Sequence, residues 1–211
     1  MKQPSLGANL MLSIATLVPG ELHPYLSKHE TDYLESQFNR FKGYPTLQQL
    51  WALMDEQWHL YGCDHLVNDE RISAFYRHPV WVLNGLFIEQ DSESLAFREA
   101  MAAWVALQKP TRIADFGGGF GCLARSVGKA LPSCTIEVIE PYAHQAAIAY
   151  ASSLPNIHYK KELKGEYDLI IATDVFEHVS DPIGVAIKTA SHLRVGGNYI
   201  MANCFRPVIQ C

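Results

Sequence analysis

The sequence predicts an α/β fold, in which a mostly parallel sheet carries helices on both faces and follows an N-terminal helical region. Short β-rich runs alternate with helical stretches after residue 110, and strands separated by helices form right-handed crossovers within a parallel sheet. The segment 169–172 is apolar at consecutive positions, as expected for a central strand buried on both faces. All four tryptophans precede Lys109. We therefore expect two units, residues 1–109 and residues 110–211.

The first unit is expected to be a helical cap. Its apolar residues recur at helical spacing from about residue 34 to residue 108, with one cluster at 47–54 and another at 95–107. The aromatic residues of this unit are candidates for selecting a substrate, although ordinary core packing is the favoured explanation of any single one of them. Those candidates are Phe75, Tyr76, Trp81 and Phe87.

The second unit is expected to contain five strands and three helices. The expected strands are 112–116, 135–140, 157–159, 167–173 and 198–203, and the expected helices are 120–130, 143–152 and 182–193.

Composition favours a small-molecule partner. The 211 residues are 48% hydrophobic and 18% charged, which is ordinary for a globular protein with a sizeable core. The net charge is −5 and no run of Lys or Arg occurs, which argues against binding to nucleic acid or to an anionic membrane. The five cysteines are scattered without a C-x-x-C pair, so we expect neither disulfides nor a zinc site, and we expect a reducing cytoplasm.

A glycine-rich turn, Asp115 to Gly121, joins the first expected strand to a helix. Glycine allows positive φ angles and has no Cβ to block a ligand, and the free N–H groups of the following helix can bind an anion. The turn therefore predicts a site for a small anionic or zwitterionic molecule. A dinucleotide fingerprint would need Gly or Ala at position 122, where Cys122 stands, so a nicotinamide enzyme is disfavoured.

Acidic residues follow three of the expected strands. Glu140 ends the second strand, 23 positions after Gly117, where a carboxylate can accept hydrogen bonds from both hydroxyls of a ribose. Asp115 and Asp174 also fall at carboxyl ends of strands, and ligands of open α/β sheets bind there. For Asp115, direct ligand contact and ordering of the glycine turn through backbone hydrogen bonds are equally open.

The loop after the fourth strand contains Glu177 and His178, which allow three interpretations. His178 could act as a general base, Glu177 and His178 could bind a metal ion, or both could chiefly hold the loop in place. Asp181 and Pro182 resemble the N-cap and first residue of a helix, which favours the structural interpretation.

Taken together, these motifs resemble the class I S-adenosylmethionine-dependent methyltransferases, in particular methyltransferase types 11 and 23. The resemblance covers about residues 110 to 205 and rests on D-x-G-x-G-x-G, the strand-two acid, D-x-x-E-H-x-x-D-P and L-x-x-G-G. It implies a Rossmann-like domain that binds S-adenosylmethionine and methylates a small-molecule acceptor on oxygen or nitrogen. The implied cofactor contacts are Asp115, Phe116, Gly117, Gly118, Gly119, Glu140, Pro141, Tyr142, Thr173 and Asp174.

The same resemblance leaves several alternatives open. Some related O-methyltransferases of the ubiquinone pathway associate a divalent cation with positions matching Asp174, Glu177 and His178. The family's adenine-contacting acid after strand three has only Glu162 as a candidate. A non-catalytic partner subunit that keeps the fold is the alternative to an enzyme.

The end of the sheet departs from the family pattern. A complete core has a further helix and hairpin after strand five, whereas only eight residues follow Asn203. We therefore expect a sheet that is cut short, with strand five at its edge. Such an edge can pair with another chain, which allows a homo-oligomer, or the chain is a fragment, or the N-terminal unit covers the edge.

Overall fold

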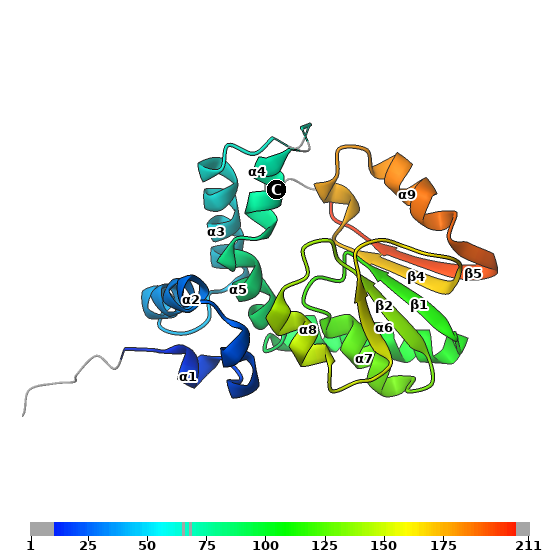
Figure 1. Ribbon diagram of the computed structural model, residues 1–211, viewed down its shortest axis with the longest axis horizontal. Helices are drawn as coiled ribbons and strands as arrows, with labels where there is room; N and C mark the ends of the chain where they lie inside the picture. The colour runs from blue at the N-terminus through cyan, green and yellow to red at the C-terminus, as the bar shows by residue number, and fades with distance from the viewer. Residues whose placement is uncertain (1–10, 65, 68, 206–211) are drawn as a thin grey trace, which may run out of the picture.

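A computed structural model describes residues 11–64, 66–67 and 69–205 and contains a five-stranded sheet with the order β3-β2-β1-β4-β5 (Figure 1). The strands are β1 (Arg112–Phe116), β2 (Thr135–Ile139), β3 (Ile157–Lys160), β4 (Tyr167–Thr173) and β5 (Leu193–Ala202). Every neighbouring pair is parallel. The predicted α/β class is confirmed.

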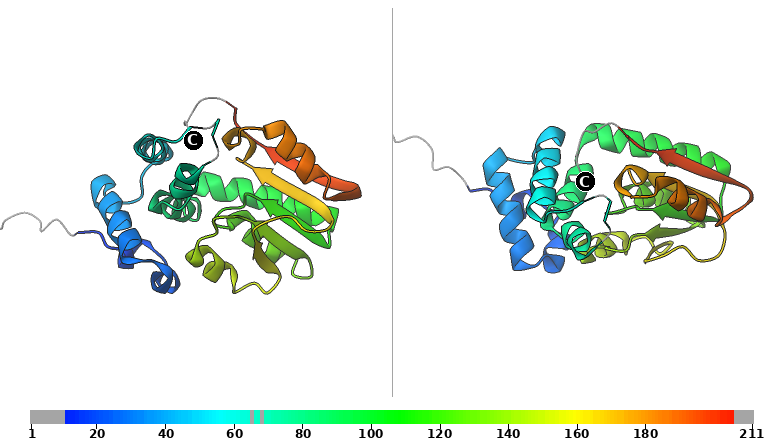
Figure 2. Two further views of the ribbon diagram at one scale, coloured as in Figure 1. Left: turned by 45° about the horizontal axis from the view of Figure 1, so that its top comes forward. Right: turned by 90° about the horizontal axis from the view of Figure 1, so that it is seen from above.

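Some helices precede the sheet in the chain and others alternate with its strands. They are α1 (Ile14–Leu17), α2 (Lys28–Phe41), α3 (Leu47–Leu60), α4 (Glu70–Tyr76), α5 (Pro79–Ile88), α6 (Ser92–Gln108), α7 (Cys122–Ala130), α8 (Gln145–Ala151) and α9 (Pro182–Ala190), with 3₁₀ turns η1 (Gly20–Tyr25) and η2 (Phe176–His178). Helices α1 to α5 lie beside the carboxyl ends of the strands (Figures 1 and 2). None of the helices in the described part of the chain is long and apolar enough to cross a membrane.

Helices cover the two faces of the sheet unequally. Helices α6, α7 and α8 pack on one face, where Val105, Val127 and Ala151 share a core with Ile113 and Leu169. The other face carries α9 (Figure 2). It also holds a smaller core around Ala114, Tyr167 and Ile170. The connection from β3 to β4, residues 161–166, contains no helix and crosses that face as a single segment. One face is therefore closed and the other is partly open.

Local sequence signals explain where the helices begin. The side chains of Ser27 and Thr46 each form a capping box with the residue three positions later, which satisfies free N–H groups at the starts of α2 and α3. Asp181 caps α9, where its Oδ1 accepts a hydrogen bond from Gly184 N at 2.9 Å, and Pro182 is the first helical residue. The predicted N-cap is confirmed.

Some predicted boundaries shift for identifiable reasons. The structure confirms the predicted bounds of β1 and β4, but α7 begins at Cys122 instead of residue 120 because Gly121, at φ 75°, is its left-handed N-cap. The predicted helix 182–193 ends at Ala190, and β5 begins at Leu193 instead of residue 198. The register of β5 on β4 is irregular between Tyr167 and Leu169, which lets the longer strand include two glycines.

The N-terminal helices share a core with the second unit. Leu34, Phe38 and Leu83 are fully buried in this core, which also includes Phe120 of the glycine turn and Ala146 of α8. The cap therefore packs directly against the segment where the candidate site lies.

Strand β5 is the edge of the sheet, as predicted, because among the described strands it pairs with β4 alone. Its residues from Val195 to Ala202 carry no charge, and the side chains of Val195 and Met201 are exposed. Charges, prolines and bulges are the usual protection of an exposed edge. The charge in β5 is that of the exposed Arg194 near its start, and the stretch from Val195 to Ala202 has neither charges nor prolines.

Candidate functional site

The glycine turn has the backbone conformation that its sequence predicts. Gly117, Gly119 and Gly121 have φ angles of 72°, 51° and 75°, in the left-handed region that favours glycine. Gly117 N donates to Ile139 O at 2.9 Å, and Gly121 N donates to Gly118 O at 2.8 Å. The turn is therefore folded back on itself at the carboxyl ends of β1 and β2.

Neighbouring glycines of this turn serve different purposes. A Cβ on Gly117 would lie 2.5 Å from Val175 Cγ2, and one on Gly118 would lie 2.6 Å from Asp115 Oδ2, so both positions are closed by the protein. A Cβ on Gly119 would meet no atom of the described residues within 4 Å. Gly119 is thus the position where the turn borders open space that a ligand could occupy.

Asp115 lies buried beneath the turn. Its residue is 2% exposed, and its Oδ2 has no hydrogen-bond partner among the described residues. Burial raises the pKa of Asp115 to about 7, against the opposing effect of the Arg98 cation and with a further increase from Glu140. The structure places this carboxyl under Gly118 and leaves one of its oxygens without a protein partner.

Glu140 holds two backbone amides at the same edge of the sheet. Its Oε2 accepts a hydrogen bond from Gly119 N at 3.2 Å, and its Oε1 accepts one from Tyr142 N at 3.1 Å. Burial raises the pKa of Glu140, and these two hydrogen bonds oppose that rise. Because each carboxylate oxygen can accept a second hydrogen bond, Glu140 can still bind a diol.

Tyr142 connects the loop after β2 to the helical cap. Its ring is stacked on Tyr76 with centroids 5.8 Å apart and an interplanar angle of 2°, and its hydroxyl lies 3.0 Å from Ser73 Oγ. The Arg77 guanidinium lies 5.5 Å from the same ring. Through Tyr76 and Ser73, helix α4 therefore contacts the loop after β2 on this side of the site. The adjacent Pro141 is exposed.

Asp174 occupies a special position after β4. It is a non-glycine residue with a φ of 54°, and its N donates to Ala202 O at 2.8 Å. Burial raises its pKa, as does the charge of Glu177, while Arg98 and His178 oppose the rise. Thr173 ends β4 directly beside it. Asp115 on β1 and Asp174 after β4 lie near the carboxyl ends of two neighbouring strands.

The loop after β4 is tied to the segment after β5. Glu177 Oε1 accepts from Cys204 N at 2.8 Å, and Asn203 Oδ1 accepts from Val175 N at 3.0 Å and from Phe176 N at 2.9 Å. Glu177 Oε2 is buried and has no hydrogen-bond partner in the described structure. These contacts support the structural interpretation of Glu177.

The metal interpretation gains no support. Within residues 11–64, 66–67 and 69–205, no three His, Cys, Asp or Glu side chains are grouped so that they could hold a metal ion. Asp174, Glu177 and His178 are close in sequence but are not arranged as a ligand set.

A family comparison identifies the chain. A model of the methyltransferase domain (Methyltransf_23) matches residues 86–202, more than half of the sequence. The chain belongs to this methyltransferase domain family. The predicted resemblance is confirmed, whereas a search among curated proteins finds no match.

Solved structures show the same fold. Coclaurine N-methyltransferase, bound to N-methylheliamine and SAH, is 17% identical, with a TM-score of 0.52 over 89% of this chain and 63% of that protein. An O-methyltransferase family protein from Burkholderia thailandensis is 12% identical, with a TM-score of 0.56 over 87% of this chain and 57% of that protein. The methyltransferase domain described here thus spans about three fifths of the length of these two structures.

The structure also assigns contacts to residues that the sequence did not single out. In this methyltransferase domain, Tyr159 Oη donates to Gly119 O at 3.2 Å, and Arg125 Nη1 donates to Phe120 O at 2.7 Å. The sequence does contain a clue to Arg125, because it is a lone arginine among the apolar residues Leu123, Ala124 and Val127, which are buried with it on α7. A charged residue among buried neighbours usually has a specific partner.

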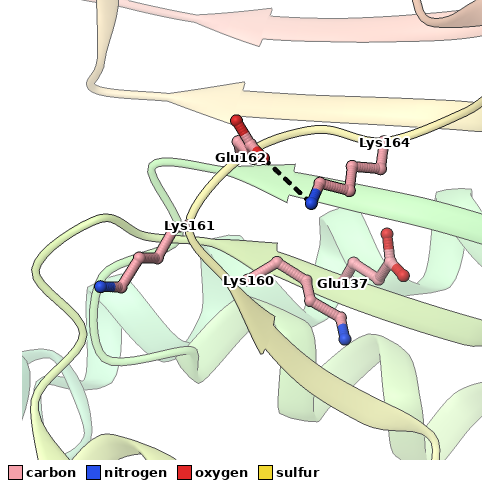
Figure 3. A pocket seen from close by; sticks show the side chains of 5 residues that line it. All are labelled: Glu137, Lys160, Lys161, Glu162 and Lys164. Atoms are coloured by element: carbon pink, nitrogen blue, oxygen red, sulfur yellow. Dashed lines mark ion pairs between the residues drawn. The ribbon is translucent and has the colours of Figure 1, made fainter.

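Two surface cavities lie away from the glycine turn. One, of about 440 Å³, is lined by Glu137, Lys160, Lys161, Glu162 and Lys164 (Figure 3). There Glu162 pairs with Lys164 at 3.0 Å, so the candidate for the adenine contact faces this cavity. The other, of about 650 Å³, is an apolar groove between α9 and β5.

Proposed function

We propose that this methyltransferase domain binds S-adenosylmethionine and transfers its methyl group to a small-molecule acceptor. The observation that carries the proposal is the open space that the described residues leave at Gly119, with the half-buried carboxyl of Glu140 bonded to Gly119 N and the buried carboxyl of Asp115 beneath the adjacent Gly118. Open α/β sheets bind their ligands at this edge. Membership of the family and the SAH-bound structure of coclaurine N-methyltransferase support the choice of ligand.

The residues at this edge fit the cofactor. Glu140 would accept the hydroxyls of the ribose, and Gly117 to Gly119 would lie along the sugar and the methionine. Pro141 and Tyr142 would border the adenine, and Thr173 and Asp174 would lie near the methionine end. Two features agree with a ligand here: among residues 11–64, 66–67 and 69–205, Asp115 Oδ2 has no hydrogen-bond partner and no atom crowds Gly119.

Bound S-adenosylmethionine supplies an electrophilic methyl group that an acceptor attacks directly. The chain therefore needs mainly to hold the acceptor in line and to exclude water, since positioning alone lowers the barrier by several kcal/mol. A general base is needed only when the attacking atom must lose a proton, as a hydroxyl does. The cap helices, which line the same edge of the sheet, are the natural source of acceptor contacts.

Two measurements test the proposal. Calorimetry should detect binding of S-adenosylmethionine and S-adenosylhomocysteine but not of NAD. Transfer of a labelled methyl group to a panel of hydroxyl and amine acceptors should then identify the reaction. Binding without transfer to any acceptor would favour the non-catalytic partner subunit, and absence of cofactor binding would reject both interpretations.

We expect His178→Ala to lower the melting temperature by about 2–4 °C, the effect of losing about 1 kcal/mol in a domain of this size. Turnover, measured where the variant is fully folded, should stay within a few-fold of the parent, because His178 lies in a loop tied by Glu177 and Asn203. A fall of about 10²–10⁴-fold that is relieved at high pH would instead identify His178 as the general base. Sensitivity of the unmutated protein to chelators would identify a metal ligand.

We also propose that two copies of the chain associate through β5. We further propose that the protein works in the cytoplasm and binds neither nucleic acid nor a membrane. The uncharged stretch of β5 from Val195 to Ala202 supports this pairing, as do the exposed side chains of Ile183, Ile187 and Met201 beside it. Sedimentation should show a dimer that Met201→Glu dissociates. Leu60→Glu, at an exposed position of the cap, should leave the dimer intact, and a monomeric parent protein would contradict the proposal.

A further inference from the structure

A buried ion pair joins the helical cap to the glycine turn. Arg125 on α7 is 6% exposed, and its Nη2 pairs with Glu89 Oε1, where Glu89 is the C-cap of α5. Its Nη1 donates to Phe120 O at 2.7 Å, and its guanidinium lies 4.3 Å from the ring of Tyr150. One guanidinium therefore contacts both the cap and a carbonyl of the turn.

Helix α5 also contacts the turn directly. A Cβ built on Gly85 would lie 2.4 Å from Phe120 Cγ, so the ring of Phe120 lies against the backbone of α5. Glu89 follows Gly85 by one helical turn on the same helix. The side chain and the carbonyl of Phe120 are thus both fixed by α5, the side chain through Gly85 and the carbonyl through Glu89 and Arg125.

Two consecutive carbonyls of the turn are held by side chains. Tyr159 Oη donates to Gly119 O, and Arg125 donates to Phe120 O. Because a peptide unit is planar and trans, fixing its carbonyl also fixes the direction of the N–H on the next residue. Glycine-rich segments have many accessible conformations, so such ties select one of them.

Stability alone does not account for this ion pair. Removing two charges from water costs about as much as their attraction returns, and apolar replacements of buried pairs are often neutral or stabilising. A planar guanidinium with several donors can, however, define the relative position of two groups.

We propose that Glu89 and Arg125 are positioning residues, which hold the glycine turn in its binding conformation by linking it to α5. The conformation of the turn then depends on the cap as well as on the sheet. The identity of the ligand in this inference rests on the proposed function, whereas the conformation of the turn does not.

The ligand-free protein provides the first test. Amide hydrogen exchange at Gly117, Gly119 and Gly121 should become at least about 10-fold faster in Arg125→Met. In this variant the turn can open without breaking the hydrogen bond between Arg125 and Phe120 O, so opening costs less free energy. Arg125→Lys should behave similarly, since an ammonium lacks the fork needed to reach Glu89 and Phe120 O together. Glu89→Gln, which keeps an oxygen acceptor for Arg125, should give a smaller increase and serves if the arginine variants do not fold.

The matched control is Glu137→Gln. Glu137 pairs with Arg112 at 2.9 Å on the other face of the sheet, and both side chains are partly buried. This variant should lower global stability without changing exchange at the three glycines. Unchanged exchange in folded Arg125→Met and Glu89→Gln, or an equal change in Glu137→Gln, would overturn the proposal.

Affinity for S-adenosylhomocysteine provides the second test. Calorimetry should show binding about 10-fold or more weaker in Arg125→Met and Arg125→Lys, and unchanged binding in Glu137→Gln. Normal affinity in the arginine variants would reject a positioning role. A parent protein that does not bind this ligand would reject the proposed function, and the exchange measurement would then decide the positioning role by itself.

Discussion

Gly119→Val should abolish binding of S-adenosylmethionine while leaving the protein folded. In the part of the chain that the structure describes, the Cβ of residue 119 would meet no atom within 4 Å, so the valine methyl groups would enter the space assigned to the ligand. The φ of 51° adds backbone strain of about 1–2 kcal/mol, which a domain of ordinary stability tolerates. We expect an affinity at least ~100-fold weaker, or about 2.8 kcal/mol, by calorimetry.

Gly196→Val is the matched control for this substitution. Gly196 has a φ of 81°, and a Cβ there would also meet nothing within 4 Å. It lies in the first half of β5, close to Arg194, and Arg194 pairs with Asp168 near the start of β4. Gly196 is therefore near the amino ends of the strands, whereas the candidate site lies at their carboxyl ends. This variant should be strained to a similar degree yet bind the cofactor normally. Equal loss of binding in both variants would attribute the effect to strain and would contradict the site.

Glu140→Ala should weaken S-adenosylmethionine and S-adenosylhomocysteine equally. Both molecules carry the same ribose, and loss of a hydrogen bond to a charged group costs roughly 1.5–3 kcal/mol. The substitution also releases the N–H groups of Gly119 and Tyr142, which Glu140 holds at 3.2 and 3.1 Å. Affinities measured by calorimetry for the two ligands should therefore fall by the same factor, about 10- to 150-fold.

Glu162→Ala is the corresponding control, because Glu162 is an exposed acid that pairs with Lys164 away from the turn. Its removal should leave both affinities unchanged. Weaker binding of only one ligand by Glu140→Ala would show that Glu140 does not contact the sugar. Weaker binding in Glu162→Ala would instead support the adenine contact that the family resemblance implies.

The hydrophobic pattern of the sequence predicted the fold well where strands are buried on both faces. Strand β4 is such a case, since Leu169, Ile170 and Ile171 are all buried and its bounds agree with the prediction. The edge strand β5 was predicted five residues too short at its start, because exposed Arg194 and Val195 and the pair Gly196-Gly197 give no alternating pattern. Edge strands depend on their neighbour for pairing more than on their own sequence.

The candidate site was predictable only where residues close in sequence determine it. The positive φ angles of Gly117 and Gly119 follow from local backbone geometry, and Glu140 lies near the turn because parallel neighbouring strands end together. The contacts of Arg125 with Glu89 and of Tyr159 with Gly119 join residues 36 and 40 positions apart. Such contacts depend on how α5 and β3 pack, which no local motif specifies.

The position of α6 determines how the chain can be divided for experiments. This helix precedes residue 110, yet its Ala102 and Val105 are buried in the core of the sheet with Ile113 and Leu169. A recombinant piece that starts at residue 110 would leave this apolar face uncovered and would be prone to aggregate. A piece that starts before Ser92, close to the first residue of the family match, would retain the helix and its N-cap Asp91.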